Sequence, residues 1–391
     1  MGLMNEYITR GMTANDLEQE LLRLIGFYNI QRKTFLVVYA AAIAKSIPSV
    51  SLNMDDYYII HDLLKGAKSK NLDFYIETPG GSGETAEEIV DFIRNKFETV
   101  AFVISGEAKS AGTIMTLSAD EIWMTESGSL GPIDAQVRIG RSTISGYDYM
   151  DWVKARRKDA QKKGRLNPFD ATMIAQISPG ELKGVDNALN FASDLVVEWL
   201  PKYKFKNWAK TQTRGVAVTD AMKKKRAKEI VKALIDHSKW RSHGRSLKID
   251  DLETIGLQIN KIDSDPKLAD TVYRIQAVVK LLFSTTNFYK VYATESDKIF
   301  ASAAQAGIPS PMISPQQVEV VQLEIKCQQC GKPHKLYAKL VSNPKIDEDF
   351  KNKGFEKFPE NNKLICECKY EIDLTGVRND IEAQTGKKIL A

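Results

Sequence analysis

Short apolar runs alternate with segments of helical period along the first third of the chain. The apolar runs lie at 34–39, 73–77, 100–105 and 121–124. The run at 100–105 is nearly continuous, which is typical of a strand buried in a parallel sheet. Apolar residues recur at helical spacing in the segments 1–34, 57–67, 84–97 and 111–118. Strands and helices in this order predict an α/β unit with a parallel sheet and right-handed crossovers.

The pattern becomes mainly helical after the turn at Gly131-Pro132. From 147 to about 235 the period predicts helices with basic faces, and 249–259 has helical character. Residues 268–293 have the period of one long amphipathic helix. We therefore expect a helical extension that follows the α/β unit.

A proline-rich stretch at 308–315 is the best linker candidate in the chain. Alternation over 318–326 predicts a strand beyond it, which leads into the first cysteines. The expected organisation is an α/β core with a helical extension over 1–260, a helical segment over 261–308 and a small C-terminal module over 309–391.

Composition narrows the class of protein without identifying it. The 391 residues are 43% hydrophobic and 27% charged, which is ordinary for a globular protein, and the net charge of +5 does not by itself predict a nucleic-acid partner. The N-terminus lacks the basic and apolar regions of a signal peptide. The longest apolar run, 35–44, is too short to span a bilayer. These features predict a cytoplasmic protein without a membrane span.

Two glycine- and serine-containing turns carry the candidate chemistry. Pro79-Gly80-Gly81 follows one predicted strand, and Ser110-Ala111-Gly112 follows the next. Carboxyl ends of parallel strands meet at one sheet edge, so both turns are expected to lie together. Ser110 would then present a nucleophilic hydroxyl, and the N–H groups of Gly81 and Ala111 would face a developing oxyanion. This arrangement favours acyl-transfer chemistry.

The chain resembles the Clp protease superfold, which crotonases and signal peptide peptidases share, and more narrowly the serine dehydrogenase proteinase family. The resemblance covers roughly residues 30–260. It rests on four motifs: Glu77-Thr78-Pro79-Gly80-Gly81, Lys109-Ser110-Ala111-Gly112-Thr113, Ser118-Ala119-Asp120-Glu121-Ile122 and Leu130-Gly131-Pro132-Ile133-Asp134-Ala135-Gln136. It implies a Clp/crotonase-like core of repeated ββα units and assigns the nucleophile to Ser110 and the oxyanion hole to Gly81 and Ala111. It also implies a ring-type homo-oligomer and no cofactor for the chemistry.

The general base departs from the Clp pattern. Clp proteases carry a histidine shortly after the segment that matches 130–136, and here Ala135 occupies roughly that position. A lysine whose pKa is lowered by burial is one replacement, and Lys154 is the best candidate because it lies beside apolar residues. His243, in a loop with tryptophan and arginine, is the other.

All four cysteines lie in the C-terminal module, in the pairs Cys327/Cys330 and Cys366/Cys368. The first pair has the Cys-x-x-Cys-Gly form of a zinc knuckle, and strand-like segments flank both pairs. We expect one structural Zn²⁺ in a zinc-ribbon-like module, which leaves no open position for catalysis and offers a surface for a partner protein.

A run of basic residues at 223–228 lies on a predicted helix, where solvated surface is the favoured interpretation and nucleic acid the less favoured one. The features together predict a serine endopeptidase that hydrolyses protein or peptide substrates. The alternatives are acyl-CoA thioester chemistry on a crotonase-like fold, and an inactive Clp-fold scaffold that binds protein or nucleic acid.

Overall fold

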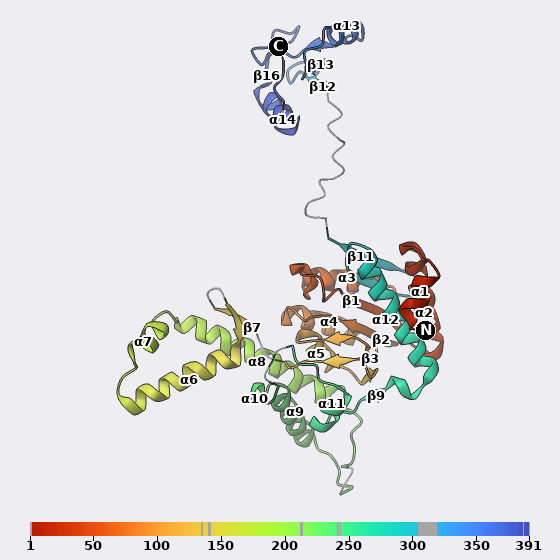
Figure 1. Cartoon of the computed structure of the whole chain (residues 1–391), viewed down its shortest axis with the longest axis vertical. Coiled ribbons are helices and arrows are strands. Elements are labelled where there is room, and N and C mark those ends of the chain that lie inside the picture. Colours follow the sequence, from red (N-terminus) through yellow and green to blue (C-terminus); the bar gives the residue numbers. More distant parts are fainter. Residues whose placement is uncertain are drawn as a thin grey trace. The chain divides into compact units, whose positions relative to one another are not determined.

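The computed structural model describes residues 2–133, 136–139, 142–211, 214–240, 242, 244–303, 319–385 and 387–390 (Figure 1). The chain forms two compact units, Met1–Ala304 and Gln305–Ala391. Within the described ranges, no helix has both the length and the apolar character that crossing a membrane requires.

A seven-stranded sheet in the order β11-β10-β1-β2-β3-β5-β9 forms the centre of the first unit. The strands from β1 to β9 in this order are parallel, and β10 and β11 extend the sheet in antiparallel fashion. Their bounds are Phe35–Ala41 (β1), Asn71–Glu77 (β2), Thr99–Ile104 (β3), Glu121–Met124 (β5), Asn260–Lys261 (β9), Phe288–Ala293 (β10) and Lys298–Ser302 (β11). The predicted α/β class is confirmed.

Helices cover both faces of this sheet (Figure 1). Leu72, Phe74 and Ile76 of β2 enter one core, and Tyr75 enters the other, as the two-residue period of a strand requires. The first core is formed with α3 (Met54–Lys65), α4 (Gly83–Lys96), α5 (Ala111–Thr116), α8 (Pro179–Lys202), α9 (Asp220–Leu234) and α11 (Ile249–Ile255). The second is formed with α1 (Leu3–Thr9), α2 (Ala14–Arg32) and α12 (Pro266–Thr285).

Smaller elements complete the first unit. Helix α6 packs on α8 around Tyr149, Val185 and Leu189, and Figure 1 shows α6 and α7 standing away from the sheet. The remaining elements are two 3₁₀ turns (Pro48–Val50 and Ile262–Ser264), β4 (Glu107–Ala108), β6 (Ser129–Leu130), β7 (Gln136–Ile139), β8 (Ser142–Ser145), α6 (Gly146–Lys163), α7 (Pro168–Ile174) and α10 (His237–Trp240).

The N-terminal segment is two helices rather than the single helix expected over 1–34. Gly11 takes a φ of 63°, a left-handed conformation that ends α1. Thr13 then caps α2 in a capping box with Asp16. Both helices still lie on the same face of the sheet, because both contribute to one core.

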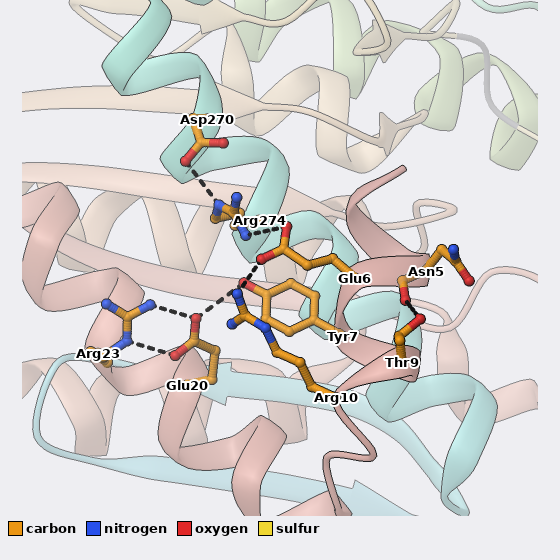
Figure 2. A network of polar contacts seen from close by, with 9 residues as sticks. All are labelled: Asn5, Glu6, Tyr7, Thr9, Arg10, Glu20, Arg23, Asp270 and Arg274. Carbon is orange, nitrogen blue, oxygen red and sulfur yellow. Dashed lines mark hydrogen bonds and ion pairs between the residues drawn. The ribbon is translucent and has the colours of Figure 1, made fainter. Parts of the chain in front are cut away.

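A polar network fastens α1 to its neighbours (Figure 2). The Tyr7 hydroxyl donates to Glu20 of α2 at 3.1 Å, and Tyr7 itself is buried. From α12, Arg274 donates to Glu6 at 3.2 Å and to Asp270 at 2.8 Å. The N-terminal helix is therefore held against both α2 and α12.

The long helix expected over 268–293 ends early, and the segment 261–308 is not purely helical. Helix α12 ends at Thr285, where Ser284 to Asn287 are weak helix formers, and β10 and β11 follow. The aromatic and β-branched residues of β10 pair with β1 instead. This part of the chain is a component of the central sheet.

The second unit combines small sheets with two helices. Strands β12 and β13 form a hairpin, β14 pairs with β13, and β15 pairs with β16. A buried apolar cluster joins these strands to α14. The bounds are Val320–Lys326 (β12), Pro333–Lys339 (β13), Pro344–Asn352 (α13), Glu356–Lys357 (β14), Lys363–Ile365 (β15), Glu371–Asp373 (β16) and Thr375–Thr385 (α14).

Candidate active site and metal centre

The segment that follows β2 pairs with the segment that follows β3, as the sequence predicts. The Thr78 N–H donates to the Glu107 carbonyl at 2.8 Å, and the Lys109 N–H donates to the Thr78 carbonyl at 3.0 Å. These two bonds place the glycine turn beside Ser110. The structure thus brings together Gly81, Ser110 and Ala111, which line one cavity.

A second backbone pairing holds the other side of the glycine turn. The Leu52 N–H donates to the Gly80 carbonyl at 2.8 Å, and the Leu52 carbonyl accepts from Ser82 at 3.0 Å. Gly81 lies opposite Leu52 in this parallel bridge. In that geometry the N–H of Gly81 points away from Leu52. The Gly81 N–H has no hydrogen-bond partner among the described residues.

A buried ion pair supports Leu52 from behind. The Lys290 ammonium donates to the Ser51 carbonyl at 3.0 Å and to both Asp56 oxygens at 2.8 Å. Asp56 also accepts from the Asn53 N–H at 2.8 Å. Burial lowers the pKa of Lys290, and the Asp56 carboxylate opposes that shift. The pair fixes 51–53 against the sheet, so the bridge to Gly81 has a rigid partner.

Ser110 stands in a strained conformation at the start of α5. Its φ is 47° and its ψ is −113°, a region that residues with a Cβ rarely adopt and that costs about 1–3 kcal/mol. Its side chain makes no capping hydrogen bond to the helix, and the residue is partly exposed. A Cβ on Gly80 would lie 2.7 Å from the Cβ of Ser110, so only glycine allows this approach.

The Ala111 N–H is the second candidate donor for an oxyanion. Ala111 is the first residue of α5, and the first N–H groups of a helix have no partner inside it. It lines the same cavity as Gly81 and Ser110. Two N–H groups without a hydrogen-bond partner among the described residues and one hydroxyl therefore border one space. Stabilisation of a tetrahedral oxyanion requires such an arrangement.

The cavity has a volume of about 700 Å³. Helix α8 provides one wall, through Asn187, Ala188, Phe191 and Ala192. Among the described lining residues there is no histidine, lysine or arginine, and Glu84 is the one charged side chain. The remaining lining residues are Ser51, Pro79, Gly80, Gly81, Ser82, Gly83, Ser110, Ala111, Ile114, Gln136 and Gly184.

Of the two candidate bases, Lys154 is the one that lies within the described residues. Lys154 is exposed on α6 and does not line the cavity. His243, Asp134 and Ala135 lie outside the described residues. The proposed role of Lys154 or His243 stays a prediction.

Lys109, which precedes Ser110, has a structural role. Its side chain is buried, and its ammonium donates to Ser129 at 3.3 Å, to Leu130 at 3.2 Å, to Arg245 at 3.3 Å and to Ser246 at 2.9 Å. Burial lowers the pKa of Lys109. The four oxygen contacts join the segments around 130 and 246 to the strand that leads to Ser110.

The four cysteines of the second unit converge. Their Sγ atoms all lie within 4.8 Å of one another, with 3.7 Å between Cys327 and Cys368 and 3.5 Å between Cys330 and Cys366. Four thiolates at about 2.3 Å from a tetrahedral zinc would be about 3.8 Å apart. The donor set therefore fits a closed, structural metal site.

Two similar turns present these thiols. In the first, Gly331 at a φ of 75° follows the cysteine pair, and the Cys327 N–H donates to the Lys332 carbonyl at 2.9 Å. In the second, Lys369 takes the left-handed position at 66°, and the Cys366 N–H donates to the Tyr370 carbonyl at 2.9 Å. The pair Cys366/Cys368 has one intervening residue where Cys327/Cys330 has two. It still forms a knuckle, because its turn has the same left-handed residue and the same type of backbone hydrogen bond.

One thiol of the first turn ionises more readily than a free cysteine. A hydrogen bond from the Cys330 backbone lowers the pKa of the Cys327 thiol to about 7. The thiolate is the form that binds metal. Cys327 and Cys366 are buried, whereas Cys330 and Cys368 are exposed.

Comparison with known proteins places the glycine turn and Ser110 in a family domain. Residues 60–191 match the family model described as NfeD1b, N-terminal domain. The match supports the expected relationship to Clp-fold serine proteinases for this part of the chain.

Curated relatives come from Methanocaldococcus jannaschii. The uncharacterized protein MJ0137 is 29% identical over 162 residues, which is 41% of this chain and 52% of that protein. The uncharacterized protein MJ1495 is 26% identical over 149 residues, which is 38% of this chain and 46% of that protein. The chain thus spans about half the length of these relatives.

Two similar solved structures are mutants of the 1510-N membrane-bound stomatin-specific protease. The first has a TM-score of 0.31 at 11% identity and covers 56% of this chain and 79% of its own. The second, in complex with a substrate peptide, has a TM-score of 0.29 at 12% identity and covers 63% and 80%.

Replacing Gly81 with alanine should disrupt the glycine turn. The new Cβ would lie 2.3 Å from the Leu52 carbonyl oxygen, at a φ of 151° that side chains disfavour. We expect the free energy of unfolding to fall by about 1–3 kcal/mol in urea denaturation. Gly184→Ala is the matched control, because Gly184 lines the same cavity from α8 and a Cβ there meets nothing within 4 Å. Equal stability of the two variants would contradict the close approach to Leu52.

Elemental analysis of the purified chain should find one zinc ion per molecule. Cys366→Ser should lose it, because one of four thiolates is removed. His334→Ala is the control, since His334 is a neighbour of the cluster in sequence and is absent from the ligand set. Acid should release the ion as the thiolates take up protons. A folded chain that contains no metal would refute the site.

Proposed function

We propose that this protein is a serine endopeptidase that hydrolyses peptide bonds of protein substrates. The observation that carries the proposal is the single cavity bordered by the Ser110 hydroxyl and the unpaired N–H groups of Gly81 and Ala111. In this mechanism, the Ser110 oxygen attacks the scissile carbonyl carbon, and the two N–H groups donate to the oxyanion. Collapse of the tetrahedral intermediate releases the amine product, and water then hydrolyses the acyl-enzyme.

The core is proposed to be a Clp/crotonase-like arrangement of repeated ββα units. Support comes from the family-model match over 60–191 and from the position of both turns at the carboxyl edge of parallel strands. The strained backbone of Ser110 supports the proposed active site as well. A conformation that costs free energy persists at a site where it exposes the reacting atom.

The lining of the cavity favours a peptide over an acyl-CoA substrate. Coenzyme A carries phosphate groups that need basic side chains, and the described lining has Glu84 but no lysine or arginine. Apolar surface from Ile114 and Phe191 suits an uncharged side chain of a peptide. The acyl-CoA alternative is therefore the weaker one.

The proton of the Ser110 hydroxyl is proposed to pass to Lys154 or to His243. In the described structure Lys154 is exposed, so it would act only if α6 changed position when substrate binds. His243 follows Trp240 closely in the chain, and Trp240 is buried in the same core as Ala111, which lines the cavity.

The second unit is proposed to hold a structural Zn²⁺ through Cys327, Cys330, Cys366 and Cys368 and to contact a partner protein. The metal would stabilise the fold of this unit, because burial of its small apolar cluster contributes little. A homo-oligomeric assembly and a cytoplasmic location complete the proposal.

A fluorophosphonate probe should label Ser110, and mass spectrometry should locate the adduct. Ser110→Ala should abolish both labelling and peptide hydrolysis without loss of folding. Ser82→Ala is the control, since Ser82 lines the same cavity but caps α4 through a bond from Thr85 at 3.0 Å. Hydrolysis that persists in Ser110→Ala would remove this residue from the mechanism.

The two candidate bases can be separated by their pH–rate profiles. Loss of the true base should lower kcat by about 10²–10⁴ and remove the ionisation on the acidic limb of the profile. Lys154→Ala and His243→Ala are therefore compared over pH 5–10, with Lys158→Ala as a control from the same helix. If both variants keep the wild-type profile, neither residue is the base.

A further inference from the structure

Charge is strongly segregated along the chain. Residues 200–248 contain 15 lysine and arginine residues and only three aspartate and glutamate residues. The remainder of the chain holds 40 basic and 47 acidic residues and so has a net negative charge. The net charge of +5 for the whole chain therefore comes from this segment. Asymmetry of this kind points to a polyanionic partner.

Helix α9 turns much of this charge toward solvent. Lys224, Lys228 and Lys232 are exposed and follow each other at a spacing of four residues, with Lys225 beside them. Four residues advance a helix by about 6 Å, so the three lysines form a stripe of about 12 Å. The opposite face of the helix is buried in the core, through Ala227, Ile230, Val231 and Leu234.

The stripe is not neutralised by the protein itself. Some exposed lysines in this unit have carboxylate partners, such as Lys65 with Asp62 at 2.6 Å and Lys183 with Asp186 at 3.0 Å. No ion pair involves the four α9 lysines named above within the described ranges, and Glu229 is already paired with Arg226 at 3.1 Å. The charges are therefore available to an external anion.

A basic hairpin precedes α9 in the chain. Lys210 and Ala217 form its bridge, and both Lys210 and Arg214 are exposed. The hairpin lies next to the start of α9 in the chain, and Lys223 of α9 donates to the Lys206 carbonyl at 3.0 Å. Lys210, Arg214, Lys224, Lys225, Lys228 and Lys232 are called the basic stripe below.

We propose that the basic stripe binds the sugar-phosphate backbone of a nucleic acid. A duplex presents about one negative charge per 1.7 Å of its axis with both strands counted, so a stripe of about 12 Å runs along about three or four phosphates of each strand. An acidic peptide offers a lower and less regular charge density. A membrane-surface helix needs an exposed apolar face, whereas Ile230, Val231 and Leu234 of α9 are buried. Among the described residues of the hairpin, Val216 is the one large apolar residue that is exposed. The proposal is independent of the chemistry at Ser110.

Binding is tested on the full chain by fluorescence anisotropy with a labelled 30-bp duplex DNA and a single-stranded RNA of the same length. With four to six contacts, log K for the duplex should fall with log[salt] with a slope of about −4 to −5. Lys224→Gln, Lys228→Gln and Lys232→Gln together should reduce this slope by about 2.7 and weaken binding at least tenfold at 100 mM salt. The two probes show whether the backbone is bound as duplex or single strand, and binding of either supports the proposal.

The matched control changes the same number of lysines on another helix. Lys158, Lys162 and Lys163 of α6 are also exposed, and their replacement by glutamine alters the net charge equally. This control should keep the wild-type slope and affinity. Equal weakening in both triple variants, or no salt-dependent binding by the wild type, would overturn the proposal. Polyglutamate or anionic phosphatidylserine vesicles that bind as tightly as the duplex would also overturn it.

Discussion

The candidate site depends on one backbone segment held between two neighbours. Residues 78–82 pair on one side with the strand that precedes Ser110 and on the other side with Leu52. Main-chain hydrogen bonds set both distances, so the position of the Gly81 N–H does not rely on mobile side chains. Preorganised donors of this kind lose little free energy to reorganisation during a reaction.

The glycines make this double pairing sterically possible. A Cβ on Gly80 would collide with Ser110, and one on Gly81 would collide with Leu52. The buried pair of Asp56 and Lys290 then secures the Leu52 side. Removal of either partner would leave an uncompensated buried charge, so the support of Leu52 depends on both residues.

Much of the fold could be predicted from local pattern. The buried strands at 73–77 and 100–105 and the helix that separates them have unmistakable periods, and their parallel order places Gly81 and Ser110 at one edge. The knuckle at Cys327 was equally visible, because its spacing and its glycine are local features. These inferences needed only neighbours in sequence and the geometry of parallel strands.

Other parts depend on contacts that a single sequence does not encode locally. Leu52 lies in no recognisable motif and gains its role only by pairing with a residue 29 positions later. Residues 288–293 continue a helical period, yet they form strand β10, because they pair with the edge of β1. The wall formed by Phe191 depends on how α8 packs, and the position of the base depends on elements remote from Ser110.

A crystal structure of the fluorophosphonate adduct would show directly whether Ser110 and the two N–H groups act together. We expect a bond from phosphorus to the Ser110 oxygen. We also expect one phosphoryl oxygen to lie about 2.7–3.1 Å from the backbone nitrogens of both Gly81 and Ala111. An adduct whose phosphoryl oxygen contacts neither nitrogen, or an adduct on another residue, would contradict this mechanism.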